Sequence, residues 1–232
     1  MSKPGKLAVA LHPNEQLWGF LYLLLELFAL PLALQELNGL LPVPLADAWL
    51  NFLYFALNFI FTCFLFRSFL KRCLIQVGKD VGSFLWITVA GFGICYVCNL
   101  ALGFFVHLIA PDFANLNDGN IAQQFDGHFA VMAIGTALLA PVAEELLHRG
   151  LVFGSLYGKN PYIAYTVSPV LFAFIHILGY VTVYPLPHLL LAFVQYLPAG
   201  LVLAWSYRKS GSIYSSILIH AAVNTLALLS LR

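Results

Sequence analysis

The chain has 232 residues, of which 61% are hydrophobic and only 9% are charged. A soluble globular domain carries about 45–50% apolar and about 25% charged residues, so this composition excludes a soluble enzyme and a disordered protein. The formal net charge of +1 gives no basis for nucleic-acid binding. The composition therefore indicates a protein that crosses a lipid bilayer several times.

Seven apolar segments are long enough to cross a bilayer as helices of about 20 residues. They cover residues 17–35, 49–69, 82–109, 128–157, 161–179, 186–207 and 212–231. None of them alternates polar and apolar residues with a period of two, which disfavours a β-barrel. The sequence therefore predicts an all-α fold, a polytopic bundle of about seven transmembrane helices.

Lysine and arginine are unevenly distributed among the predicted connections. They occur before the first span and after the second, fourth and sixth, at Lys3, Lys6, Arg67, Lys71, Arg72, Lys79, Lys159, Arg208 and Lys209. Because short cationic loops stay in the cytoplasm, we expect a cytoplasmic N-terminus. The outer side then holds Asp47, Asp112, Asp118, Asp126 and one terminal cation, Arg232. The compact chain and the lack of a long targeting segment favour a bacterial plasma membrane.

Asp, Glu, Lys and Arg are rare in the predicted spans, and only Glu26, Glu144, Glu145 and Arg149 lie well inside one. Each costs about 2.5–3.5 kcal/mol near the bilayer centre, so the last three need a partner or a wet cavity. Glu145 and Arg149 are i,i+4 neighbours on a helix and predict an ion pair. Glu144 is rotated by about 100° from Glu145 and is free to act as a general base or acid. The alternative is an ion pair that only fixes helix packing.

Polar residues in two later spans fall at a comparable depth. At 1.5 Å per residue from the cytoplasmic ends, Glu144 lies about 20 Å deep and His176 about 22 Å. In the last span, His220 lies about 12 Å and Asn224 about 18 Å deep. Taken singly, such residues are ordinary interhelical hydrogen-bond partners. Together they predict a set of side chains that can activate water and polarise a carbonyl.

Three motifs in the last four spans resemble the type II CAAX prenyl protease and bacteriocin-processing family, also called CPBP or Abi. They read Glu144-Glu145…Arg149, Phe172…His176 and His220…Asn224, and they occur in the order that the family has. From this resemblance we expect a protease core over residues 127–232. It is preceded by a region of three spans over residues 1–126, in which no motif is assigned.

The resemblance implies an all-helical intramembrane endopeptidase, a hydrolase of peptide bonds. In such enzymes the first glutamate and the histidine of the second motif activate a water molecule, here Glu144 and His176. His220 and Asn224 would form the oxyanion hole. The substrates implied are membrane peptides, such as bacteriocin or signalling-peptide precursors, and lipidated protein C termini, including prenylated ones.

The same resemblance implies that Glu145 and Arg149 hold the site in shape, and it leaves metal dependence open. The family has been called a metalloprotease, and zinc could be held here by Glu144, His148, His176 and His220. His148 stands where the family often has an aromatic residue. No HExxH motif is present, and we favour metal-free activation of water with no cofactor.

Two other functions stay open at this point. The chain could be a non-catalytic immunity or scaffold protein with the same fold. It could also be a transporter that uses the Glu and His residues as a proton relay, which the lack of internal repeats disfavours. Two further features have structural explanations: Cys95 and Cys98 pack within a span, and Glu26 either pairs with a neighbouring helix or lines the substrate path.

Overall fold

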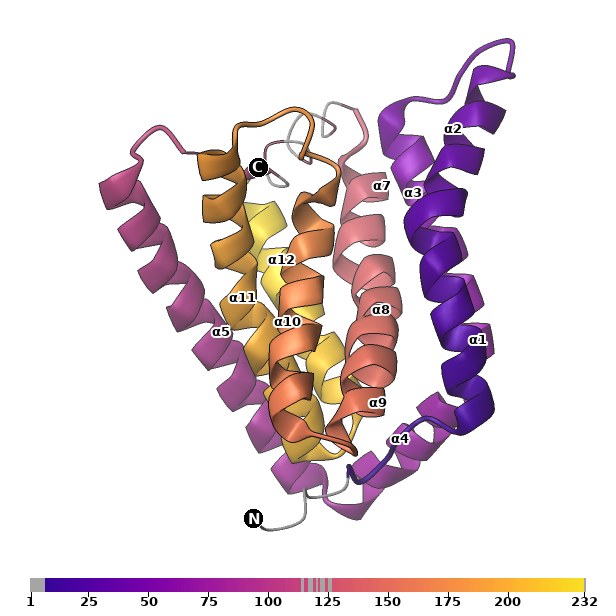
Figure 1. The fold of residues 1–232 in the computed structure, drawn as a ribbon, viewed down its shortest axis with the longest axis vertical. Helices are drawn as coiled ribbons and strands as arrows, with labels where there is room; N and C mark the ends of the chain where they lie inside the picture. Colours follow the sequence, from indigo (N-terminus) through magenta and orange to yellow (C-terminus); the bar gives the residue numbers. More distant parts are fainter. Residues whose placement is uncertain are drawn as a thin grey trace.

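The structure is a computed structural model of the chain, and it describes residues 7–113, 115–116, 119, 121, 124 and 127–231. All regular elements among these residues are helices (Figure 1). Seven helices are long and apolar enough to cross a membrane: Pro13–Gly39, Asp47–Leu65, Val81–Ile109, Phe129–Tyr157, Pro161–Leu178, Leu186–Ser210 and Ile213–Ser230. The predicted all-α fold with seven spans is confirmed.

Two of the spans are built from several helical segments. The first consists of α1 (Pro13–Leu24), the π-helical segment η1 (Leu25–Ala29) and α2 (Leu30–Gly39). The fourth consists of α7 (Phe129–Ile134), η2 (Gly135–Leu139), α8 (Ala140–Glu145), η3 (Leu146–Phe153) and α9 (Gly154–Tyr157). The other spans are single helices: α3 (Asp47–Leu65), α5 (Val81–Ile109), α10 (Pro161–Leu178), α11 (Leu186–Ser210) and α12 (Ile213–Ser230).

The predicted connection between the second and third spans contains a further helix, α4 (Arg67–Lys79). The second span ends at Leu65, four residues earlier than expected, because the chain leaves the helix at Phe66. Helix α4 is amphipathic: Phe69 and Cys73 are buried, whereas Leu74 and the cations at its ends are exposed. Periodic apolar residues in so short a cationic segment gave too weak a pattern to separate the helix from a loop.

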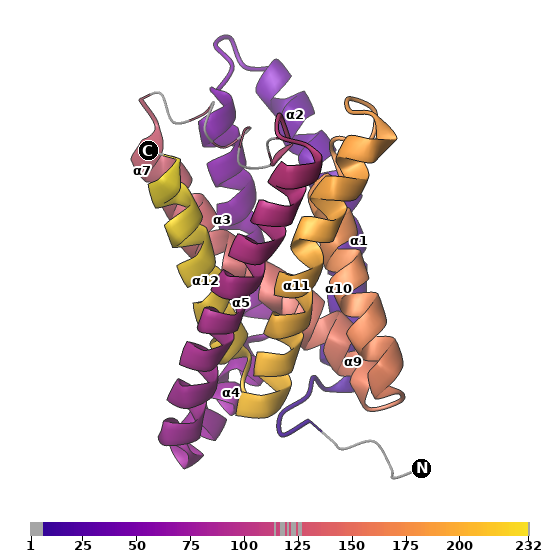
Figure 2. The same ribbon diagram turned by 90° about the vertical axis from the view of Figure 1, so that its left-hand side faces the viewer.

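The helices surround a central group formed by α8, α10, α11 and α12 (Figure 1). Helix α5 packs across α11 and α12, as Figure 2 shows from that side. Helix α3 packs against α8 on the opposite side of the bundle, and α1 and α2 pack against α3. The first three spans thus lie against two sides of the last four (Figure 1).

Helix α12 ends at the end of the bundle opposite to the start of α1, as an odd number of crossings requires (Figure 1). The end where α1 starts also holds α4 and the turns before α10 and α12, so the described cations of the predicted cytoplasmic loops lie together. Lys3, Lys6, Asp118, Asp126 and Arg232 lie outside the described residues. The cytoplasmic orientation of this end stays a prediction.

The main apolar core packs the first span and α4 against the last four spans. Leu23, Phe66 and Phe69 pack in it with Leu151 and Phe153 of the fourth span. The fourth span is the most enclosed, with 56% of its most apolar window buried, against 11–39% for the other six. The bundle is therefore organised around the span that carries the Glu144–Arg149 motif.

Helix ends on the cationic side are fixed by local capping. The Asn160 side chain accepts hydrogen bonds from the backbone N–H groups of Tyr162 and Ile163, and Pro161 occupies the first helical position of α10. Helix α11 ends at Gly211 with φ of +72°, a left-handed conformation that favours glycine. Ser212 then caps α12. These caps set where α10 and α12 begin, and hence the height of their histidines.

Candidate active site

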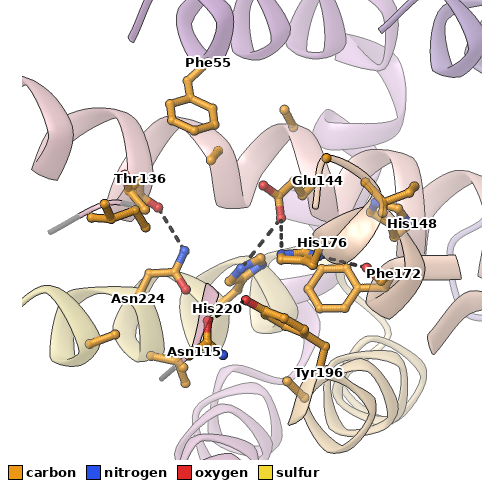
Figure 3. Close-up of a pocket in the computed structure, with 18 of the residues that line it drawn as sticks. Phe55, Asn115, Thr136, Glu144, His148, Phe172, His176, Tyr196, His220 and Asn224 are labelled. Atoms are coloured by element: carbon orange, nitrogen blue, oxygen red, sulfur yellow. Dashed lines mark hydrogen bonds and ion pairs between the residues drawn. The ribbon is translucent and has the colours of Figure 1, made fainter. Parts of the chain in front are cut away.

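A cavity of about 740 Å³ lies within the bundle, a size typical of small-molecule and peptide pockets. Its wall includes residues of all seven spans. Among them are the predicted site residues Glu144, His148, His176, His220 and Asn224 (Figure 3). The structure therefore brings the predicted candidates from three separate spans to one cavity.

The wall beside Asn224 is shaped by a proline. Pro141 has no N–H, and the N–H of Ala140 bonds to the carbonyl of Gly135, five residues back, in the π-helical segment η2. The carbonyl of Thr136 is thus left without either helical donor. Asn224 Nδ2 of α12 donates a hydrogen bond of 2.9 Å to that oxygen. The break in the fourth span consequently positions an amide from the seventh.

Glu145 and Arg149 form an ion pair, with 2.7 Å between Oε1 and Nη1 and with both side chains 0% exposed. Arg149 Nη2 lies 3.4 Å from the backbone carbonyl of Gly200 on α11, and its guanidinium stacks 4.1 Å from the Phe172 ring centroid. A buried charge is tolerated only when it is paired and hydrogen-bonded in this way. The pair therefore anchors α8 to α10 and α11.

His220 connects this ion pair to Glu144. Its Nδ1 lies 2.9 Å from Glu145 Oε1, and its Nε2 lies 3.8 Å from Glu144 Oε2. Because the carboxylate of Glu145 only accepts hydrogen bonds, Nδ1 carries the proton. A neutral His220 therefore directs the lone pair of Nε2 toward Glu144.

His176 is oriented in the same sense by its own helix. Its Nδ1 lies 2.8 Å from the carbonyl of Phe172, one helical turn earlier, and must therefore be the donor. Its Nε2 lies 3.8 Å from Glu144 Oε2, and Tyr196 packs over the ring at 4.3 Å between centroids. Both imidazoles thus direct Nε2 at one oxygen of Glu144.

Glu144 is the most accessible member of this group. Its side chain is 28% exposed, against 16% for His176 and 7% for His220. Distances of 3.8 Å are too long for direct hydrogen bonds and suit a bridging water molecule. The arrangement can bind a water molecule that donates one hydrogen bond to the Glu144 carboxylate and one to the Nε2 atom of an imidazole, and the carboxylate can act as the base that deprotonation of water needs.

His148 does not join this group. It is 3% exposed and lies edge-on to the Phe172 ring at 5.3 Å between centroids, and no ion pair links it to Glu144 among the described residues. The described part of the chain contains no group of three or more His, Cys, Asp or Glu side chains that could hold a metal ion. His148 therefore leaves the expected set of four zinc ligands, Glu144, His148, His176 and His220, incomplete.

Sequence reasoning missed several residues of the cavity wall. Thr136 and Tyr196 belong to no motif, and only their polar groups within apolar spans could have drawn notice. Tyr54 was also missed, although it donates a hydrogen bond of 2.5 Å to Glu26 across the α1–α3 interface. Glu26 pairs with a neighbouring helix, as one of the two expectations for it states, and it also lines the cavity.

Cys95 and Cys98 are free thiols. Cys95 is buried on α5, where it packs with Leu203 and Ile219, and it also contributes to the cavity wall. This placement agrees with the expectation that the C-x-x-C spacing serves helix packing.

Comparison with known proteins finds a family similarity in the last four spans. Residues 126–226 match the model of the family described as Type II CAAX prenyl endopeptidase Rce1-like. The family resemblance inferred from the three motifs is thereby confirmed for this part of the chain. The first three spans lie outside the matched residues. No solved structure matches the chain at a significant level.

Two curated proteins are similar to part of the chain. One is "UPF0177 protein YxdF" of Lactococcus lactis, 36% identical over 87 residues, which are 38% of this chain and 42% of that protein. The other is "Putative membrane peptidase YdiL" of Bacillus subtilis, 32% identical over 96 residues, which are 41% of this chain and 35% of that protein. The similarity therefore spans less than half of each relative.

Proposed function

We propose that the chain is an intramembrane endopeptidase that hydrolyses peptide bonds of membrane-associated peptides or lipidated protein C termini. The match of residues 126–226 and the printed name of one relative support a membrane protease. One observation carries the catalytic assignment: the Nε2 atoms of His176 and His220 each lie 3.8 Å from Glu144 Oε2 inside a cavity.

In the first step, a water molecule binds between Glu144 and the Nε2 atom of His176. The carboxylate of Glu144 takes one proton from this water molecule while the water oxygen attacks the carbonyl carbon of the scissile peptide bond. A new C–O bond forms, and the electrons of the C=O double bond move to the carbonyl oxygen. His176 orients the water because its ring is held by the Phe172 carbonyl.

The resulting oxyanion is stabilised by hydrogen-bond donors that are already in place. Asn224 Nδ2 has a second N–H besides the one that it donates to Thr136. His220 can donate from Nε2 only as the imidazolium, because Nδ1 is committed to Glu145, so in the reacting enzyme His220 has taken a proton from solvent before the water attacks and keeps it throughout. The Glu145 carboxylate holds that cation in place, so the buried ion pair acts as a positioning element.

In the last step the C–N bond breaks and the protonated Glu144 returns its proton to the leaving nitrogen. The products are a new carboxyl group and a new amine, and the enzyme recovers its starting charge. We place this chemistry in residues 127–232, with the first three spans enclosing the cavity, and we place the protein in a bacterial plasma membrane.

The proposal is tested with purified protein in detergent or liposomes and a library of membrane-associated peptides, read by mass spectrometry. Wild-type protein should cut some of them, whereas Glu144→Ala and His176→Ala should lower the rates by about 100- to 10,000-fold. His107→Ala is the matched control, since His107 is exposed and lies outside the cavity wall. Cleavage that persists in both site variants would overturn the assignment.

The same assay separates the rival functions and tests for a metal. A scaffold or immunity protein would cut no peptide, and both site variants would keep its biological effect. A transporter would move protons into liposomes with its substrate, which the proposed enzyme would not do. Exhaustive chelation should leave the cleavage rate unchanged, and a loss that zinc restores would contradict the metal-free mechanism.

A further inference from the structure

The cavity described above carries more negative charge than the proposed reaction uses. Among the described residues that line it, the acidic ones are Glu26 and Glu144, and there is no lysine or arginine. Glu145, by contrast, is neutralised by Arg149. The mechanism needs one carboxylate, so Glu26 is left to be explained.

Glu26 is brought to this wall by the first two spans. Tyr22 and Glu26 are one turn apart in the first span, as Tyr54 and Asn58 are in α3. Tyr54 donates to Glu26 Oε1 at 2.5 Å, and Tyr22 donates to Asn58 Oδ1 at 2.6 Å. The two bonds hold the carboxylate at the wall rather than leaving it directed at lipid. Glu26 and Glu144 line the same cavity.

The wall also carries polar atoms that lack a partner among the described residues. Thr136, 8% exposed, has no hydrogen-bond partner for Oγ1, and His148, 3% exposed, has none for Nδ1. Both residues line the cavity. Buried polar atoms without a partner are costly. The cavity wall is thus polar at Thr136 and His148 as well as at Glu26, which suits a substrate with amide groups such as a peptide.

We propose that Glu26 is a specificity-determining residue of this cavity, which binds a cationic group of the peptide substrate, a lysine or arginine side chain or a free amine. This inference rests on the proposed endopeptidase activity and narrows its substrate class. A cation brought between the polar walls compensates the charge of Glu26. A peptide with a carboxylate at the same place meets repulsion from Glu26 and Glu144, so acidic residues and a free C-terminal carboxylate are disfavoured there.

The test uses a synthetic peptide that the wild-type protein cuts, with Lys, Gln or Glu substituted at each position on either side of the cut bond. At the position that meets Glu26, kcat/KM should fall in the order Lys, Gln, Glu, with about tenfold or more between the extremes. Glu26→Gln should lose most of the Lys-to-Glu difference. Glu36→Gln should keep it, because Glu36 is exposed on the same span and does not line the cavity.

The outcomes are distinguishable. Charge discrimination that disappears in Glu26→Gln and persists in Glu36→Gln supports the inference. Cleavage without charge discrimination, or with discrimination that Glu26→Gln retains, overturns the inference while the endopeptidase activity stands. An equal loss of cleavage for all three peptides in Glu26→Gln also overturns it, since it assigns Glu26 to structure or chemistry. No cleavage of any peptide by wild-type protein overturns the proposed function itself.

Discussion

The first and fourth spans contain the same backbone feature in different surroundings. Each has a π-helical segment followed two residues later by a proline, Leu25–Ala29 with Pro31 and Gly135–Leu139 with Pro141. Each carries carboxylates close to this break. The first span has 11% of its most apolar window buried and the fourth has 56%. Both spans therefore contain the same helix break, and they differ in how much of each span is buried.

Their ion pairs show the same difference. Glu15 of the first span pairs with Arg72 at 2.7 Å, with 12% and 27% of these side chains exposed. Glu145 of the fourth span pairs with Arg149 at the same distance, fully buried. A partly exposed pair contributes about 0–1 kcal/mol, whereas breaking a buried pair costs about 3–5 kcal/mol. Enclosed and fixed charges thus lie in the span to which we assign the chemistry, and the first span supplies a wall of the cavity.

The largest effect is expected from Arg149→Met. Loss of the guanidinium leaves the buried Glu145 carboxylate without compensation, which should lower the stability by about 3–5 kcal/mol and abolish cleavage. Thermal unfolding in detergent and the peptide assay measure the two effects. The double variant Glu145→Gln/Arg149→Met should recover part of the stability without activity. A stable and active single variant would show that the ion pair is dispensable.

Asn224→Ala should lower kcat by about 100- to 1,000-fold, the effect of removing one oxyanion donor. It also leaves the Thr136 carbonyl without a partner, at a cost of about 1–3 kcal/mol in stability. Thr225→Ala, at the neighbouring exposed position of α12, is the control and should keep the wild-type rate. If KM rises while kcat is unchanged, the amide binds substrate rather than the oxyanion.

Replacing the two prolines compares the two breaks directly. Pro141→Ala restores a backbone N–H, which lets the π-helical segment relax and displaces the carbonyl that Asn224 holds. Cleavage should fall by about 10- to 100-fold, since a small misplacement at a reacting centre has such effects. Pro31→Ala alters a span that lies outside the reacting group and should change the rate less. Equal losses in the two variants would contradict this account.

The smallest effect is expected from Arg72→Gln. The pair with Glu15 joins α4 to the first span at a partly exposed position, so its loss should lower the stability by about 1 kcal/mol at most. The cleavage rate should stay at the wild-type value. Unfolding at low and high salt checks this assignment, since added salt screens such a pair. A loss of several kcal/mol would place the pair in the same class as Glu145–Arg149.

Much of the fold could be predicted because the bilayer imposes long apolar helices. The ends of the last four spans were predicted within three residues, since Pro161, Pro185 and Gly211 mark them locally. The Glu145–Arg149 contact followed from helix periodicity alone. The convergence of Glu144 and His176 followed from their similar depth, and the structure places them 3.8 Å apart.

Other features depend on contacts that no local pattern encodes. His148 was named with Glu144 as a possible zinc ligand, but the fourth span widens into the π-helical segment η3 and packs His148 against Phe172. The Tyr54–Glu26 bond and the Tyr196 stack on His176 join residues of different spans. Helix periodicity predicts which residues share a face of one helix, and it does not predict the partners of those residues on neighbouring helices.

The role of Glu144 is tested most directly by Glu144→Gln, which keeps the size of the side chain and removes the base. Purified wild-type and variant protein are compared on one cleavable peptide, with thermal unfolding to show that both are folded. The account predicts a folded variant whose kcat is lower by about 100-fold or more. A folded Glu144→Gln protein that cuts the peptide at the wild-type rate would contradict it.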